Sequence, residues 1–227
     1  MEKKKLGMII LGSIFIISVA LGIYQAIRVN DRKTDSIKFK TEYESINGQE
    51  NSSNKNYAAL DINKDNPMIY ADYDKIYEVL NGTGVIFFGF KECPWCRAAI
   101  PVLLEAAKEI GIDKIYYLNN KEDRDTKSLV DGNVVTEKEG TAEYYKLLDK
   151  LGTEYTEEYS GLNDSSIRRL YFPTVLVVKD GKIISSIVGT VDSQTDPYVS
   201  LTESQKSELK NNYIENMKKT LLCDQSC

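Results

Sequence analysis

Two cysteines three residues apart, Cys93 and Cys96 in the run CPWC, carry the clearest chemistry in this sequence. The apolar run Val85–Phe88 precedes them and a helical pattern from Arg97 to Ile110 follows, so the pair falls where a buried strand meets a helix. Unpaired backbone N–H groups and the positive end of a helix dipole favour a thiolate at such a place. The spacing also lets the two sulfurs close a small disulfide ring. These residues therefore predict dithiol–disulfide chemistry.

The overall composition excludes several other kinds of function. The chain has no histidine, which rules out histidine acid–base catalysis, Cys–His nucleophile pairs and histidine-ligated metals. The net charge of −5 argues against a nucleic-acid groove. We therefore expect no bound metal, no other cofactor and no nucleic-acid partner.

A second pair of cysteines, Cys223 and Cys227, stands at the end of the chain. The pair would form a disulfide that ties off the C-terminus, although two residues spaced by four in an intact helix have marginal geometry for this bond. A second redox pair that exchanges with Cys93 and Cys96 is the alternative. A zinc site made from all four thiolates is a third interpretation, but Pro94-Trp95 at a helix start does not resemble a zinc-binding loop.

The N-terminal part of the chain predicts a membrane anchor. Leu6 to Ile27 is apolar, and about 22 helical residues span the roughly 30 Å of a bilayer core. Lys3, Lys4 and Lys5 precede this run, so residues 1–5 are expected in the cytoplasm and the rest of the chain outside. A signal peptide cleaved after Ser18-Val19-Ala20 is the alternative, and it also places the domain outside the membrane. Residues 28–57 are polar and are expected to form a flexible linker.

Residues 58–222 show the patterns of one α/β domain, followed by the Cys tail 223–227. Beyond the strand and helix around CPWC, we expect a helix from Asp72 to Leu80, a strand at 114–118, a hairpin of strands at 172–178 and 182–188, and a C-terminal helix. Thr202 to Gln205 is a capping box for that last helix, which presents Leu209, Tyr213, Ile214, Met217 and Leu221 at helical spacing. Residues 119–165 are expected to form a mainly helical insertion, with a hairpin at Asp131-Gly132, a helix at 141–151 and a short helix at 164–170.

This order of elements, together with a few spaced residues, resembles the thioredoxin superfamily. Those residues are the CPWC run, Pro101 five positions after Cys96, Phe172-Pro173-Thr174, and two glycines, Gly181 and Gly189, each eight positions after the previous landmark. Within the superfamily the chain looks most like membrane-tethered thioredoxin-like proteins of Gram-positive bacteria, including bacteriocin transport accessory proteins. The resemblance covers Met68 to Leu222 without the insertion, and it implies an α/β thioredoxin-like fold with a central mixed sheet flanked by helices.

The resemblance also implies roles for individual residues. Cys93 would be the attacking thiolate and Cys96 the resolving thiol, while Pro173 would be a cis-proline facing the disulfide. Pro94, Trp95, Phe172 and Thr174 would support the site or contact substrate. The substrates would be exported proteins or peptides that carry thiols or disulfides, with a redox partner in the membrane as a further candidate.

Three departures from the thioredoxin pattern bear on the chemistry. The strand before CPWC lacks the buried acid that assists the second thiol, so we expect Glu92, Lys91 or water to handle the proton of Cys96. Pro94-Trp95 contains no histidine, which leaves Lys91 or Arg97 as the cation beside the Cys93 thiolate. The segment between Leu118 and Tyr171 is longer than a minimal thioredoxin needs, and such insertions often carry partner recognition.

The sequence thus predicts an extracytoplasmic, membrane-anchored thiol–disulfide oxidoreductase. The alternative is a non-catalytic thioredoxin-fold adaptor of an export system, in which the disulfide is structural. The direction of electron flow depends on the relative stability of the dithiol and the disulfide, which sequence patterns do not report.

Overall fold

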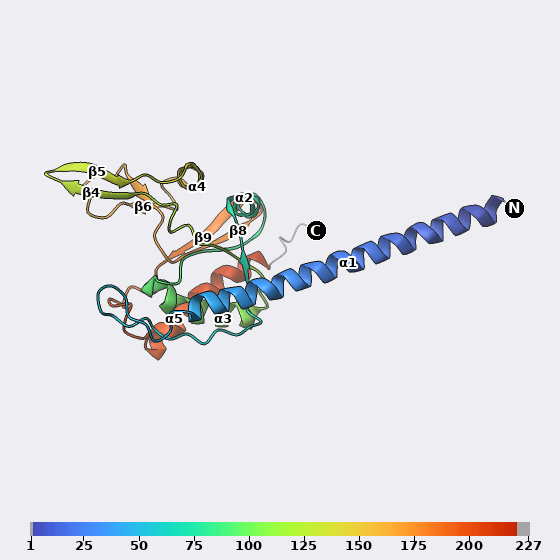
Figure 1. The fold of residues 1–227 in the computed structure, drawn as a ribbon, viewed down its shortest axis with the longest axis horizontal. Coiled ribbons are helices and arrows are strands. Elements are labelled where there is room, and N and C mark those ends of the chain that lie inside the picture. The colour runs from blue at the N-terminus through green and yellow to red at the C-terminus, as the bar shows by residue number, and fades with distance from the viewer. Residues whose placement is uncertain (1, 222–227) are drawn as a thin grey trace.

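A single long helix, α1 (Glu2–Glu44), leads into an α/β body in this computed structural model. The structure describes residues 2–221, with side chains described for residues 16–23 and 30–221. Figure 1 shows the N-terminal part of α1 extending far from the body, while its C-terminal part lies against it. Cys223 and Cys227, the predicted second pair, lie outside the described residues.

The body is built on a mixed sheet of five strands in the order β1-β3-β2-β8-β9. The strands β1, β3 and β2 run parallel, β8 is antiparallel to β2, and β9 is antiparallel to β8. Their bounds are β1 (Met68–Tyr70), β2 (Gly84–Phe88), β3 (Ile115–Leu118), β8 (Thr174–Lys179) and β9 (Lys182–Val188). Mixed sheet and helices together are compatible with a thioredoxin-like fold.

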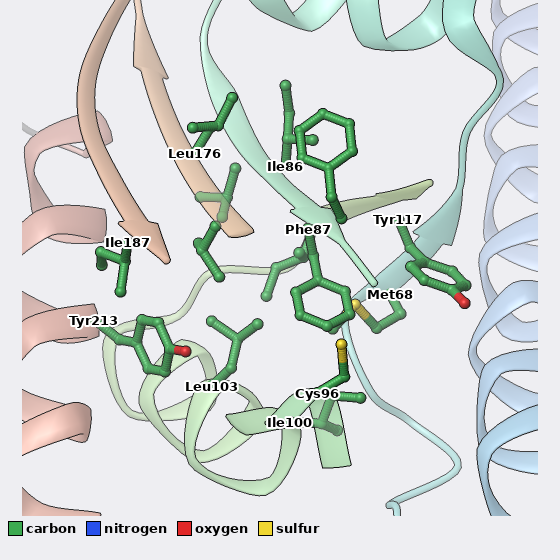
Figure 2. Packing of buried hydrophobic residues seen from close by; sticks show 14 of the residues in the cluster. Met68, Ile86, Phe87, Cys96, Ile100, Leu103, Tyr117, Leu176, Ile187 and Tyr213 are labelled. Carbon is green, nitrogen blue, oxygen red and sulfur yellow. The ribbon is translucent and has the colours of Figure 1, made fainter. Parts of the chain in front are cut away.

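The helices α2 (Tyr73–Leu80), α3 (Pro94–Ile110) and α5 (Glu203–Met217) cover this sheet. The central strand β2 is buried on both faces, because Val85, Ile86, Phe87 and Phe88 are each at most 1% exposed. Figure 2 shows Phe87 pointing toward α3 and Ile86 toward the opposite face of the sheet. Because successive side chains of β2 point to opposite faces, this one strand packs against the helices on both sides of the sheet.

Most of the predicted elements are confirmed, within a few residues at their ends. Asp72 caps α2 by accepting a hydrogen bond from Lys75 N, and the capping box between Thr202 and Gln205 is present at α5. In α5 the predicted apolar residues are buried with one exception: Leu221 is 51% exposed. That prediction was wrong because α5 ends at Met217 and a 3-10 turn, Lys218–Thr220, changes the helical register.

The prediction of a flexible linker at residues 28–57 was wrong. The helix α1 continues to Glu44, and Phe39 and Tyr43 on it are fully buried. Both rings pack on Tyr117 of β3, with centroid distances of 5.0 Å and 5.9 Å. Ser36, Phe39, Tyr43 and Ile46 form a buried stripe at helical spacing within a polar segment, so the folded body begins well before residue 58.

The prediction of a mainly helical insertion was also wrong. Residues 119–165 contain the hairpin β4 (Thr126–Val130) and β5 (Asn133–Lys138), one helix α4 (Ala142–Leu151), and the short strand β6 (Glu157–Glu158). The predicted turn at Asp131-Gly132 is confirmed, with φ of 49° and 79°. In place of the short helix expected at 164–170, β7 (Arg168–Arg169) pairs with β6, a contact that local helical patterning does not report. Figure 1 shows the β4–β5 hairpin projecting from the body.

The predicted anchor, residues 6–27, falls mostly on residues whose side chains are outside the described set. Within the described part of the chain, no helix is both long and apolar enough to cross a bilayer.

Candidate functional site

The two thiols of CPWC lie where the sequence places them, at the junction of β2 and α3. Cys93 is the N-cap of α3 and its Sγ accepts a hydrogen bond from Cys96 N at 3.2 Å, while Pro94 occupies the first helical turn, where its missing N–H costs nothing. Both cysteines are free thiols in the structure. The sulfur of Cys93 therefore faces the unpaired N–H groups of the helix start.

The loop before β8 closes over Cys93 from the other side. The peptide bond Phe172–Pro173 is cis, as the family resemblance implied, and the Cys93 thiol donates to the carbonyl oxygen of Phe172 at 3.6 Å. These residues are far apart in sequence, and the antiparallel pairing of Phe88 with Thr174 brings them together. Thr174 is fully buried and its hydroxyl donates to Tyr171 O at 2.7 Å, so it holds the loop rather than facing a substrate.

The two thiols differ in their tendency to ionise. Burial works to raise the pKa of Cys93, but hydrogen bonds from the Cys96 thiol and from the backbone N–H groups of Cys96 and Trp95 outweigh it, so the pKa is lowered. Burial raises the pKa of Cys96 well above its ordinary value, and the neighbouring Cys93 adds to this. Cys93 is thus the more readily ionised thiol of the pair.

Apolar side chains of the core surround the sulfur of Cys96. Figure 2 shows this sulfur pointing toward Phe87 and Met68. A side chain at Gly89 would place its Cβ 3.0 Å from the sulfur and 2.8 Å from the Phe87 ring, so the backbone after β2 can approach only as glycine. Two tyrosine hydroxyls, those of Tyr43 and Tyr213, are buried with no hydrogen-bond partner among the described residues.

The polar groups expected to serve Cys96 are engaged elsewhere. Glu92 lies 3.7 Å from Lys121 in an ion pair, and Lys91 donates to the hydroxyl of Ser45 at 3.2 Å. The strand β2 itself carries no acid, as its sequence already indicated. The buried surroundings of Cys96 are therefore apolar and tyrosine-rich.

Arg97, one of the two cations expected beside the thiolate, turns away from it. Arg97 is 1% exposed, and its guanidinium donates to the carbonyl oxygens of Tyr43 and Ala58 and to Asn47 Oδ1, at 2.6 to 2.9 Å. Arg97 therefore ties the N-terminal segment to α3 and does not serve as a cation for Cys93.

Arg124, which the sequence analysis did not single out, lies beside the site instead. Its guanidinium carbon lies 4.3 Å from the centroid of the Phe172 ring, and its charge acts to lower the pKa of Cys93. Arg124 belongs to the segment between β3 and β4, so no motif or spacing relative to CPWC indicates it. Only the folding of the insertion back onto the Phe172 loop reveals this position.

A groove of about 330 Å³ opens beside Trp95, the residue before Cys96, and neither cysteine lines it. Trp95 lines it together with Tyr171, Phe172, Glu157, Asp192 and Gln194. The insertion contributes Glu157 and the loop after β9 contributes Asp192, so the lining includes two carboxylates as well as aromatic side chains. A larger cavity of about 830 Å³ lies between α1 and the second half of α3, and neither thiol lines it.

The remaining predictions for the site concern metals. Among the described residues, no three Cys, Asp or Glu side chains are grouped as a metal site would require. The four-thiolate zinc alternative needs Cys223 and Cys227, which lie outside those residues.

Comparison with known proteins assigns no family to the chain. No family model matches it, and no curated protein matches it. The function must therefore be argued from the geometry of the site.

Proposed function

We propose that this chain is an extracytoplasmic, membrane-anchored thiol–disulfide oxidoreductase with a thioredoxin-like fold. The observation that carries the proposal is the asymmetry of the CPWC thiols: Cys93 caps α3 with a lowered pKa, and Cys96 is fully buried with a raised pKa. A readily formed thiolate beside a protonated partner is the arrangement that thiol–disulfide exchange requires.

In the reductive direction, the Cys93 thiolate attacks one sulfur of a substrate disulfide. The substrate S–S bond breaks, a mixed disulfide forms on Cys93, and the substrate leaves as a thiolate that takes a proton from solvent. The backbone N–H groups at the start of α3 stabilise the thiolate before the attack.

Cys96 then completes the exchange. It loses its proton and attacks the sulfur of Cys93, so the Cys93–Cys96 disulfide forms and the second substrate thiolate leaves. Two electrons pass from the dithiol to the substrate in the whole sequence. In the oxidative direction, the same steps run in reverse from the Cys93–Cys96 disulfide.

The groove beside Trp95 supports a polypeptide substrate. Phe172 of the cis-proline loop lines it, and its aromatic and carboxylate side chains suit an extended peptide that carries the reacting cysteine. The substrates proposed are exported proteins or peptides.

The location rests on the sequence. The apolar run Leu6–Ile27 preceded by Lys3, Lys4 and Lys5 supports an anchor with the N-terminus in the cytoplasm. Since α1 is one helix from Glu2 to Glu44, the anchor would continue directly into the stripe that packs on Tyr117. The site would then be held close to the extracytoplasmic face of the membrane.

The test is disulfide exchange by the full chain in detergent, measured as dithiothreitol-driven reduction of insulin. Cys93→Ser should abolish the activity. Cys96→Ser, reduced and then incubated with insulin after removal of dithiothreitol, should accumulate a mixed disulfide visible on non-reducing gels. The Cys223→Ser, Cys227→Ser double variant is the matched control, and it should retain activity. Unchanged activity in Cys93→Ser would refute the proposal.

One observation favours the alternative function, a non-catalytic adaptor of an export system. Cys93 is only 5% exposed, which limits the approach of a bulky disulfide. Alkylation of the reduced, native protein separates the two functions, because an enzyme needs a Cys93 that reacts rapidly near neutral pH and an adaptor does not.

A further inference from the structure

Charged and titratable side chains from several parts of the fold lie around Cys93 and Arg124. They are Lys91 and Glu92 before α3, Cys96 on α3, Lys121, Arg124 and Asp125 after β3, Tyr144 on α4, Tyr159 after β6, and Arg169 on β7. Most of them already have a polar partner. Lys121 pairs with Glu92 and with Glu122, at 3.7 Å and 3.6 Å, and Asp125 pairs with Lys127 at 3.5 Å.

Two of these cations, Arg124 and Arg169, form no ion pair among residues 30–221, and the Nε atom of each is buried with no hydrogen-bond partner there. Arg169 donates to Asp125 O at 3.0 Å, whereas no hydrogen bond this short is made by Arg124 in that range. Its one hydrogen bond in the described structure is a long one, from Nη1 to Leu170 O at 3.5 Å. A partly buried guanidinium without a carboxylate is costly unless another negative charge lies near it.

Phe172 links Arg124 to one group that can carry such a charge, the thiol of Cys93. The guanidinium of Arg124 stacks over one side of the Phe172 ring at 4.3 Å, and Phe90 meets the same ring edge-on at 5.3 Å. The carbonyl oxygen of Phe172 lies 3.6 Å from Cys93 Sγ. Phe172, the residue before the cis-proline, therefore contacts both groups: Arg124 through its ring and Cys93 through its carbonyl oxygen.

We propose that Arg124 is the cation that stabilises the Cys93 thiolate and thereby sets the redox poise of the Cys93–Cys96 pair. The inference rests on the proposed function, because a redox poise matters only for a dithiol that exchanges electrons. Arg124 acts here as a positioning residue: its ring contact holds the Phe172 loop over the thiol while its charge stabilises the thiolate.

The mutual influence of the two groups supports this assignment. Burial and the nearby Arg169 both lower the pKa of Arg124, and Cys93 works against this by raising it. In the other direction, the charge of Arg124 is among the influences that lower the pKa of Cys93. Each group thus favours the charged form of the other.

The consequence for electron transfer follows from the charges of the two redox forms. The Cys93–Cys96 disulfide and two glutathione thiols give the Cys93 thiolate, the Cys96 thiol, one glutathione disulfide and one released proton. The thiolate exists only in the reduced form, so Arg124 stabilises that form and makes the pair more oxidising. Removal of the charge should raise the pKa of Cys93 by about one unit. The equilibrium with glutathione should then shift by up to about tenfold toward the disulfide, which corresponds to about 30 mV.

The experiment is a pH titration of the thiolate absorbance at 240 nm in the reduced full chain, with the titration of Cys93→Ser subtracted. Arg124→Gln should raise the pKa of Cys93, and Arg124→Met should do the same while keeping an apolar stem against Phe172. Arg124→Lys, which keeps the charge, should restore part of the effect. Lys121→Gln is the matched control, because Lys121 belongs to the same segment but is already paired with two carboxylates.

The second readout is the ratio of dithiol to disulfide in glutathione buffers. If Arg124 had only a structural role, this ratio would not change in parallel with the pKa of Cys93. An unchanged Cys93 titration in folded Arg124→Gln or Arg124→Met would overturn the inference and leave the oxidoreductase proposal standing. If Arg124→Gln raises the pKa of Cys93 as expected but the wild-type chain reduces no insulin, the proposed function alone is overturned.

Discussion

Arg97 donates a hydrogen bond of 2.7 Å to the backbone carbonyl of Tyr43, so the residue that follows Cys96 is tied to the N-terminal helix. The same guanidinium also binds Ala58 O and Asn47 Oδ1. The segment between the predicted anchor and the CPWC helix is therefore attached to the site, and movement of α1 relative to the body would strain the start of α3.

Arg97→Met should destabilise the protein strongly. The substitution leaves several buried carbonyl oxygens without a donor, and a loss of about 3–5 kcal/mol in the free energy of unfolding is expected. Urea unfolding of the full chain in detergent measures it. Arg32→Met is the matched control: Arg32 forms one exposed ion pair with Asp113 at 2.9 Å, and its loss should cost less than about 1 kcal/mol. Equal effects of the two substitutions would contradict the role given to Arg97.

Two N-terminal deletions should behave differently. Removal of residues 1–29 leaves the buried stripe of α1 intact, so the body should still unfold cooperatively. Removal of residues 1–57 also removes Phe39 and Tyr43 and exposes Tyr117, which is fully buried in the intact chain. Loss of two large aromatic contacts costs about 3–5 kcal/mol each, which is comparable with the whole stability of a domain of this size. Circular dichroism during urea unfolding measures the stability of each fragment. If the fragment without residues 1–57 were as stable as the one without residues 1–29, α1 would be dispensable for the fold.

The two chemical steps should depend on pH in different ways. Because the pKa of Cys93 is lowered, formation of the mixed disulfide by Cys96→Ser should reach its plateau below about pH 8.5, the ordinary thiol value. The pKa of Cys96 is raised, so resolution of a preformed mixed disulfide in the wild-type chain should keep accelerating above that pH. Quenched-flow measurements of each step give the two profiles. Coincident profiles would contradict the asymmetry of the thiols.

The same shifts affect stability with opposite signs. The folded-state pKa of Cys93 lies below its unfolded value, so its contribution is present above about pH 8.5 and is lost as the pH falls through the folded value. For Cys96 the folded-state pKa is higher, so its contribution is present below about pH 8.5 and is lost as the pH rises through the folded value. Urea unfolding of the reduced variants on both sides of about pH 8.5 should show the two trends separately. Cys96→Ser reports the contribution of Cys93, and Cys93→Ser reports that of Cys96.

The carboxylates of the groove should favour substrates with basic residues beside the reacting cysteine. Glu157→Gln combined with Asp192→Asn should lower kcat/KM for a lysine-flanked peptide disulfide by about two- to fivefold at low salt, because each exposed carboxylate contributes at most about 1 kcal/mol. A neutral peptide should be processed as before. Glu137→Gln, on the exposed strand β5, serves as the control. Equal losses for both peptides would show that the groove does not select by charge.

The local elements of the fold could be predicted because their signals lie within short stretches of sequence. The apolar run of β2, the cap residues Asp72 and Thr202, and the turn at Asp131-Gly132 each act on neighbouring residues, and each is confirmed. The failures share one feature. Phe39 and Tyr43 in a polar segment, and Arg168 and Arg169 in β7, take their conformation from partners far away in the sequence.

The sequence by itself determined that a dithiol stands at the junction of a buried strand and a helix, because CPWC, its flanking patterns and Pro173 are local features. The tertiary structure decided which cations surround it. Arg97, three residues from Pro94, turns inward to bind the backbone of residues 43 and 58, while Arg124 from the insertion reaches the ring of Phe172. A charge acts through distance in space, and spacing along the chain reports that distance only within a single element.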